Sequence, residues 1–209
     1  MPKQIQRSRE IYIAPEILGK YENSSPIVID ERHDRMLDPK DIDDKITIYE
    51  REVSDWFLNP AEALLNHNNF RSSFIVLMVC MSYFEGVEQY KTGVESTRRS
   101  KQCFIDSVKR IYANQFQDRD LAKLYSKSRC GLFHNGMVEG GVIFSDSFDD
   151  VMVFENNGEI IKINPRKLLS DIKRDFENYI NEIRSPNFSF CNERQRILRE
   201  NFDRMFSVL

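Results

Sequence analysis

The two side chains best suited to chemistry are Arg129 and His134, which are separated by four residues. Histidine titrates near neutral pH, so its ring can give or accept a proton under physiological conditions. Arginine stays charged and presents a planar fork of N–H donors that can hold an anion. This pair is therefore the first candidate for a chemical centre in the chain.

Four nearby or complementary residues are candidates for supporting roles. Asn135 could orient a substrate or the imidazole, and Ser126 and Lys127 could contact anionic groups, although exposed polar residues on a helix are more often simply solvated. Glu85 lies in an otherwise apolar stretch, and a buried carboxylate normally needs a cationic partner. We therefore expect Glu85 to pair with Arg129 in a structural role rather than a catalytic one.

The cysteines and histidines form no metal-binding pattern. There are four cysteines and three histidines, far apart and without a Cys-x-x-Cys pair, so no zinc spacing can be written. We expect no cofactor and no metal site, with the cysteines reduced and packed in the interior of a cytoplasmic protein. The two remaining histidines, His33 and His67, lie in polar loop sequence and receive no role. The cysteines are Cys80, Cys103, Cys130 and Cys191.

The overall composition is that of a globular protein. The 209 residues are 41% hydrophobic and 30% charged, which is enough to build a core. A net charge of −3 argues against a general nucleic-acid coat, although acidic residues elsewhere can conceal a local basic groove. The first residues lack the apolar stretch of a signal peptide, and the longest apolar run, Phe74 to Phe84, is too short to cross a bilayer. We expect a soluble protein without membrane contact.

Helical signals dominate the chain after residue 37. Asp38-Pro39, Asn59-Pro60 and Asn164-Pro165 each place a capping residue before a proline, which favours a helix start. The third helix, over about residues 70–91 and ending at Gly93, is apolar all round in its central turns and should be the buried axis of a bundle. Further helices are expected over about residues 97–113 and 118–134, from Asn164-Pro165 with one apolar stripe, and from about residue 192. The stripe consists of Leu169, Ile172, Phe176, Tyr179, Ile180 and Ile183.

Two stretches predict β-structure. Short apolar runs at 142–144, 151–154 and 160–163 indicate strands, and Asn157-Gly158 is a two-residue hairpin signal because both positions favour positive φ. Residues 1–37 look irregular and predict an extended arm with one or two short strands. The expected fold is mainly α: a helical bundle over residues 38–209 with a small β-hairpin or meander insert at about 140–164, before the last helices.

The helix over residues 118–134 carries the candidate pair. At about 100° per residue, its apolar side chains form one stripe, with Arg129 at the edge and His134 about 140° further round if the helix stays regular. The positions between these two are small or apolar, so the helix should be covered on a second side as well. A second copy of the chain, the β-insert or the N-terminal arm could each provide that cover. The stripe consists of Leu121, Leu124, Tyr125, Ser128 and Leu132.

The segment Leu-Tyr-Ser-Lys-Ser-Arg-Cys-Gly-Leu-Phe-His-Asn-Gly-Met, from Leu124 to Met137, has a recognisable pattern. Its arginine and histidine, late in a bundle helix, resemble the Arg-x(4–6)-His motif of the HEPN superfamily. The Gly-rich exit, followed by a hairpin and a long helix, is also similar to members of that group. The resemblance covers about Phe70 to Ile183 and implies a HEPN-like helical bundle.

Active HEPN proteins resemble metal-independent ribonucleases that dimerise and bring two Arg/His pairs into one cleft. The resemblance implies that His134 moves the proton of a ribose 2′-hydroxyl or of the leaving 5′-oxygen, while Arg129 holds the scissile phosphate. The local dipole near a helix C-terminus would favour the protonated imidazole. The expected function is thus a homodimeric endoribonuclease of the toxin or phage-defence type, with RNA as substrate.

Two other interpretations remain open. The first is a non-catalytic HEPN-like module that binds a partner, such as a nucleotidyltransferase or an antitoxin protein. The acidic pI favours this, as does Cys130, because active HEPN ribonucleases commonly have Asn, Asp or His after the arginine. The second is a structural helical domain in which Arg129 holds Glu85 and His134 caps its helix.

Overall fold

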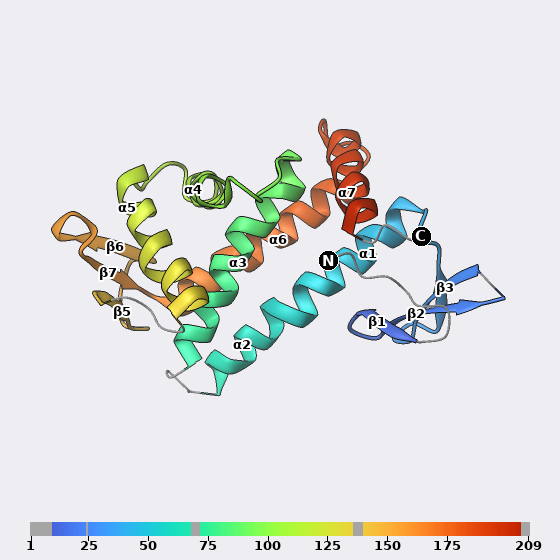
Figure 1. Cartoon of the computed structure of the whole chain (residues 1–209), viewed down its shortest axis with the longest axis horizontal. Helices are drawn as coiled ribbons and strands as arrows, with labels where there is room; N and C mark the ends of the chain where they lie inside the picture. Colours follow the sequence, from blue (N-terminus) through green and yellow to red (C-terminus); the bar gives the residue numbers. More distant parts are fainter. Residues whose placement is uncertain (1–9, 24, 68–71, 136–139, 206–209) are drawn as a thin grey trace. The chain divides into compact units, whose positions relative to one another are not determined.

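The computed structural model describes residues 10–23, 25–67, 72–135 and 140–205, without the side chains of residues 132–135 and 205. The chain forms two compact units, one made of Met1–Asn59 and Asn178–Leu209 and the other of Pro60–Glu177. Helices predominate, and a small sheet precedes the last two of them (Figure 1). The prediction of a mainly α fold with a β-insert is therefore confirmed at this coarse level.

The first unit contains a four-stranded antiparallel sheet in which the strands follow one another in sequence order. Its turns place Glu16, Asn23 and Asp34 at φ values of 56°, 50° and 48°, a region that Asn and Asp tolerate better than most residues. The predicted irregular arm is thus wrong for residues 11–37, because tight turns fold this stretch back on itself three times. The strands are β1 (Ile11–Ala14), β2 (Ile17–Glu22), β3 (Ser25–Asp30) and β4 (Arg35–Leu37).

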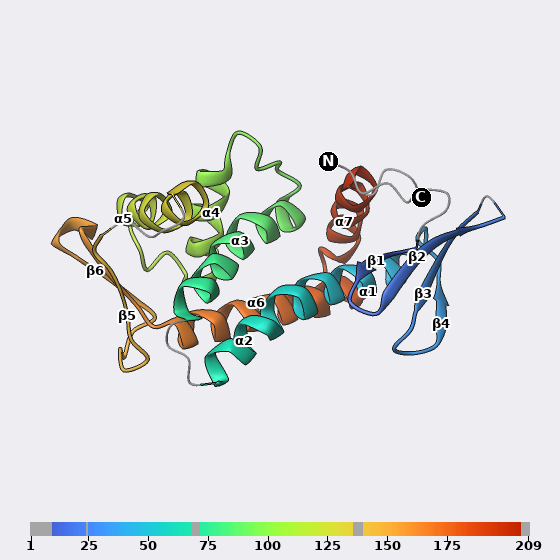
Figure 2. The same cartoon turned by 60° about the horizontal axis from the view of Figure 1, so that its bottom comes forward.

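Helices of the same unit cover this sheet (Figure 2). Helix α1 (Ile42–Val53) contributes Ile48 and helix α7 (Cys191–Met205) contributes Phe202 to the core beneath the strands. The predicted domain boundary after residue 37 therefore does not match the observed units, because the sheet and these helices bury their apolar side chains against each other. The core residues are Ile13, Ala14, Ile17, Val28, Leu37, Ile48 and Phe202.

The start of α1 differs from the predicted Asp38-Pro39 cap. The Asp41 carboxylate accepts hydrogen bonds from the backbone N–H groups of Asp43 and Asp44, at 2.9 and 3.2 Å, and so caps the helix. Asp38 instead accepts from the N–H of Lys40 in a tight turn. The helix therefore begins three residues later than predicted, because the carboxylate of Asp41, and not that of Asp38, accepts from the first free N–H groups of the helix.

The second unit is a bundle arranged around α3 (Ser73–Thr92), which ends at Gly93 with a left-handed φ of 74°. The ring of Phe84 in α3 packs edge-on against that of Phe104, with 5.5 Å between the ring centres, and the ring centres of Phe104 and Tyr125 are 5.4 Å apart. The ring centres of Tyr83 and Phe176 are 6.3 Å apart. The prediction of a helix buried on all sides holds only in part, because Phe74 and Ile75 in its first turn are exposed. The other helices of this unit are α2 (Asn59–Asn66), α4 (Ser100–Ile111), α5 (Asp118–Leu124) and the first turns of α6 (Pro165–Arg184).

The β-insert of the second unit is a three-stranded sheet beside α5 (Figure 1). Its strands are β5 (Val142–Phe144), β6 (Met152–Glu155) and β7 (Ile160–Ile163). The predicted hairpin joins β6 to β7, with Asn157 and Gly158 at φ values of 56° and 80°, but Asn156 is also left-handed and the loop is longer than two residues.

The strand order is β5-β7-β6, and β5 pairs parallel to β7, so the insert is not a meander. The connection from β5 to β6 must cross to the other side of β7. Asn164 holds this connection, because its Nδ2 donates to the carbonyl oxygens of Asp146 and Phe148 at 3.1 and 2.9 Å.

Asn164 also starts α6, as predicted from Asn164-Pro165. Its Oδ1 accepts from the backbone N–H groups of Arg166 and Lys167, at 3.1 and 3.0 Å. None of the helices within the described ranges combines the length and the apolar composition that crossing a bilayer requires. The predicted apolar stripe of α6 is buried and consists of Leu169, Ile172, Phe176, Tyr179, Ile180 and Ile183.

Candidate functional site

The helix that carries Arg129 and His134 changes its conformation at the motif. The chain is α-helical over Asp118–Leu124 and continues as a π-helix, η3, over Tyr125–Asn135. In a π-helix each N–H is directed at the carbonyl five residues earlier rather than four. The angle of about 140° expected for a regular helix is therefore wrong, and positions 129 and 134 instead occupy successive turns of the wider helix.

The structure brings Arg129 and Glu85 together, as expected from the isolated carboxylate in α3. Arg129 Nε donates to Glu85 Oε2 at 3.1 Å, and Nη2 donates to Oε1 at 3.4 Å. The guanidinium carbon also lies 5.9 Å from the centre of the Tyr125 ring. The arginine is thereby fixed in orientation, while 26% of its side chain remains exposed.

A shallow hollow of about 170 Å³ opens beside this pair. It is lined by Ser82, Glu85, Gly86, Gln89 and Arg129. A side chain at Gly86 would meet no atom within 4 Å, so the glycine leaves this space open. The hollow is smaller than the ~300 Å³ at which small-molecule pockets usually begin. It can take a single small group such as a phosphate.

The other predicted residues of this site are placed less favourably. Lys127 Nζ donates to the carbonyl oxygens of Gly140 and Glu159, at 2.9 and 3.3 Å, and so ties the helix to the β-insert. A hydrogen bond from Lys123 lowers the pKa of the Glu159 carboxyl, with a further contribution from the charge of Lys127. Ser126 is exposed. The side chains of His134 and Asn135 lie outside the described residues.

All four cysteines are free, and three of them are buried, as expected. Cys130, which follows Arg129, is only partly buried. Burial raises the pKa of the Cys80 thiol far above its ordinary range, so this side chain stays neutral in the core. Among the described residues, no group of three or more His, Cys, Asp or Glu side chains could hold a metal ion.

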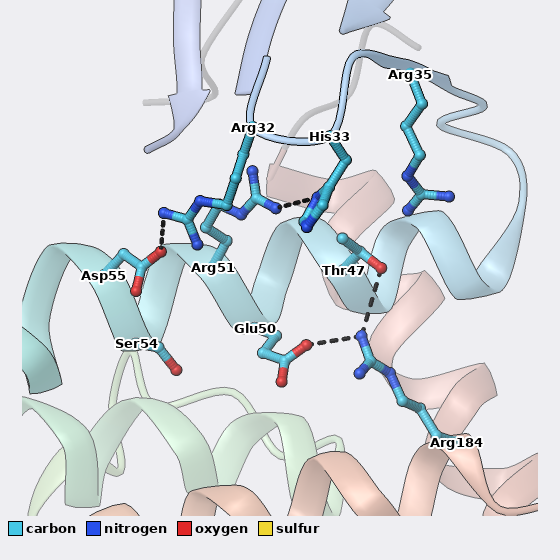
Figure 3. A pocket seen from close by; sticks show the side chains of 9 residues that line it. All are labelled: Arg32, His33, Arg35, Thr47, Glu50, Arg51, Ser54, Asp55 and Arg184. Atoms are coloured by element: carbon cyan, nitrogen blue, oxygen red, sulfur yellow. Dashed lines mark hydrogen bonds and ion pairs between the residues drawn. The ribbon is translucent and has the colours of Figure 1, made fainter. Parts of the chain in front are cut away.

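A second and larger hollow lies within the first unit, at residues to which the sequence assigns no role (Figure 3). Its volume is about 590 Å³. Figure 3 shows side chains from α1, from the loop between β3 and β4, and from the end of α6 around it. It is lined by Arg32, His33, Arg35, Thr47, Glu50, Arg51, Ser54, Asp55 and Arg184.

A fully buried carboxylate, Asp30, organises one side of this hollow. Arg51 donates to both of its oxygens, at 2.5 and 3.1 Å, and the His33 ring contacts it through Nδ1 at 2.7 Å. Because an ionised carboxylate can only accept, a hydrogen bond to Asp30 requires the proton on His33 Nδ1. Arg51 Nη2 also lies 3.2 Å from this nitrogen (Figure 3). The ring is thereby held through Nδ1, and His33 is one of the residues that line the hollow.

Asp30 is ionised at neutral pH despite its burial. Burial alone would raise the pKa of this carboxyl, but hydrogen bonds from Arg51 and His33 outweigh it and lower the pKa to about 2. Asp30 is therefore a permanent anion between a buried guanidinium and an exposed imidazole.

One sequence signal could have indicated this site. Val28 and Asp30 are two residues apart in β3, so they face the same side of the sheet, and both are buried. A charged residue on the inward face of a strand requires a partner. His33 itself gave no such signal, because it lies in a run of charged loop residues.

Comparison with known proteins gives no match: no family model, no curated protein and no solved structure is significantly similar to this chain. Function must therefore be inferred from the two sites themselves. The first offers one oriented guanidinium at a phosphate-sized hollow, on a helix that also carries His134. The second offers an oriented imidazole among several guanidinium groups.

Proposed function

We propose that the chain is a HEPN-like, metal-independent endoribonuclease with Arg129 and His134 as its catalytic pair. The observation that carries this proposal is the π-helix over Tyr125–Asn135, which coincides with the motif. Well under 1% of residues adopt this conformation, and it frequently occurs at functional sites. Eleven consecutive π-helical residues that include both members of the pair are hard to explain by packing alone.

The geometry of Arg129 suits a phosphate-binding role. Its fork is oriented by Glu85, and it borders a hollow that fits one phosphate group. In the proposed reaction the ribose 2′-oxygen attacks phosphorus and loses its proton to a histidine. The bond to the 5′-oxygen breaks, and that oxygen receives a proton, leaving a 2′,3′-cyclic phosphate and a free 5′-hydroxyl. A homodimer would supply one His134 as the base and the other as the acid.

A non-catalytic binding module is the second candidate. It is favoured by the ion pairs that the cationic side chains of this helix already form with carboxylates of the same chain. Lys123 and Lys127 contact Glu159, and Arg129 contacts Glu85, so little uncompensated positive charge remains for an RNA strand. The module would then bind a partner protein, such as a nucleotidyltransferase or an antitoxin.

Cleavage of mixed RNA by the purified full chain in the presence of EDTA tests the proposal. His134→Ala should lose at least about 100-fold in rate, the usual contribution of a positioned acid or base. Arg129→Ala should lose about as much, because it removes a donor that stabilises the charge of the transition state. His67→Ala is the matched control, since it removes an exposed histidine outside the site and should cleave like the parent. Circular dichroism of each variant checks that it is folded, and sedimentation measures the expected homodimer.

The outcomes separate the two candidates. Products ending in 2′,3′-cyclic phosphate, formed by the parent and by His67→Ala but not by the other two variants, would support the ribonuclease. Equal cleavage by the parent and by His134→Ala would refute it. Absence of cleavage together with a stable complex with a second protein of the native host would favour the binding module.

A further inference from the structure

The hollow of the first unit has the size and the lining of a site for a small charged ligand. Its volume of about 590 Å³ is in the range of about 300–1,000 Å³ that is typical of ligand pockets. Its lining is polar and mostly charged, with no aromatic residue apart from the His33 ring. Such a lining suits a compact ionic group rather than a planar apolar one.

Cationic side chains reach this hollow from separate elements. Arg32 and His33 come from the loop after β3, Arg35 from β4 and Arg184 from the end of α6 (Figure 3). A guanidinium has five N–H donors. Among the described residues, Arg184 Nη2 forms an ion pair with Glu50 at 2.7 Å and donates a hydrogen bond to Thr47 at 3.4 Å. Donors of Arg184 are therefore available to an incoming anion.

Arg35 is held even less firmly. Its ion pairs with Asp30 and Asp44 are 3.8 and 3.3 Å long, and 48% of its side chain is exposed. Arg32 contacts Glu16 and Asp55, and both it and Glu16 are exposed. Exposed ion pairs of this kind contribute little stability because water competes for both partners. A phosphate group that accepts two parallel N–H bonds can therefore displace a carboxylate from these arginines.

The His33 ring is exposed but held in a fixed orientation. Its side chain is 58% exposed, yet its Nδ1 is held by a carboxylate that is fully buried and bonded twice to Arg51. Buried ion pairs seldom add net stability compared with apolar residues of the same size. The hydrogen bond made by one ring nitrogen sets the protonation state of the other, so Asp30 orients the ring and leaves Nε2 for a ligand in the hollow that His33 lines.

We propose that this hollow binds a phosphomonoester, with Arg35 and Arg184 donating to the phosphate oxygens and His33 contacting the phosphate through Nε2. The site is separate from Arg129 and His134, and it does not depend on the proposed ribonuclease function. On binding, the phosphate would displace Asp44 from Arg35 and Glu50 from Arg184. The buried Asp30–Arg51 pair would stay in place and keep the ring oriented.

Histidine-ring NMR of the full chain tests this proposal, because only three histidines contribute signals. The His33 signal is identified by its loss in His33→Asn. The chain is titrated with inorganic phosphate and with adenosine 5′-monophosphate at constant ionic strength; adenosine and sodium chloride serve as controls. We expect a saturable shift of the His33 signal with both phosphates and none with the two controls.

Variants localise the binding. Arg35→Gln and Arg184→Gln should each weaken phosphate binding about tenfold, the loss expected for one charge-assisted contact. Arg196→Gln is the matched control, because Arg196 is an exposed arginine of the same unit that pairs with Glu200 on α7. It should bind phosphate like the parent. Absence of a saturable His33 shift, or equal weakening in Arg184→Gln and Arg196→Gln, would overturn the proposal.

Discussion

Replacement of Asp30 by asparagine should strongly destabilise the first unit. The substitution keeps the shape of the side chain but removes the charge and replaces one accepting oxygen by an N–H donor. Arg51, only 6% exposed, would then face an amide group with no anion beside it. Removing one partner of a buried ion pair typically costs about 3–5 kcal/mol in the free energy of unfolding.

The pKa of Asp30 gives an independent magnitude. A fall from an ordinary value near 3.8 to about 2 corresponds to about 2 kcal/mol of stabilisation of the ionised form. This value is smaller than the cost of about 3–5 kcal/mol because it reflects the loss of the charge alone. In asparagine, an N–H donor also replaces an accepting oxygen and points at the guanidinium. We therefore expect Asp30→Asn to lower the free energy of unfolding by about 3 kcal/mol at pH 7.

Urea unfolding followed by tryptophan fluorescence measures this loss. The chain has a single tryptophan, Trp56, in the π-helix η1 (Ser54–Leu58) of the first unit. Its signal therefore reports the unit that contains Asp30. Glu200→Gln, which breaks an exposed pair with Arg196 in the same unit, is the matched control and should cost less than about 0.5 kcal/mol.

The loss should also depend on pH. Folding lowers the pKa of Asp30, so the ionised carboxylate stabilises the folded state. This stabilisation is fully present at a pH above the pKa of Asp30 in the unfolded chain, and it is lost as the pH falls through the pKa in the folded chain. The difference in the free energy of unfolding between the parent and Asp30→Asn should be constant above about pH 5 and shrink between about pH 4 and pH 2.

In the double variant Asp30→Asn/Arg51→Met, much of the lost stability should return, because no buried charge remains unpaired. A loss below about 1 kcal/mol at pH 7, or one that does not change in acid, would refute this account of the pair.

Three other substitutions test the second unit by thermal or urea unfolding followed by circular dichroism. Gly141→Ala should cost well over about 1 kcal/mol, because φ is 93° and the new Cβ would lie 2.1 Å from the carbonyl oxygen of Glu159; an unchanged midpoint would contradict this close approach. Gly86→Ala should instead stabilise the chain by up to about 1 kcal/mol, since it lies inside α3 with open space beside it. Phe84→Ala should cost about 3–5 kcal/mol because the ring is fully buried between α3 and α4, and a loss below about 1 kcal/mol would show that the core is assembled differently.

The helices and their ends were largely predictable from the sequence. Asn164-Pro165 and Gly93 start and end helices as expected, because capping depends on side chains that act within one turn of the chain. The apolar stripe of α6 identified its buried face for the same reason. Where two capping carboxylates competed, at Asp38 and Asp41, local patterns could not decide between them.

The N-terminal sheet was harder to predict. Its strands are short, and three turns are made by Glu16, Asn23 and Asp34 rather than by glycine, so the usual hairpin signals are weak. Its stability comes from apolar contacts with Ile48 and Phe202, which lie far away in the chain. Patterns within a few residues carry no information on such contacts.

For function, the sequence by itself indicated Arg129 and His134 as candidates, and Glu85 as the carboxylate that Arg129 contacts. Only the tertiary structure revealed the π-helical geometry of that pair and the hollow around His33. The physical reason is that the i→i+5 pattern depends on how a helix is packed, not on its residue types. Likewise, the charge that orients His33 lies on β3 and is held by Arg51 of α1, so it becomes visible only when strand and helix are folded together.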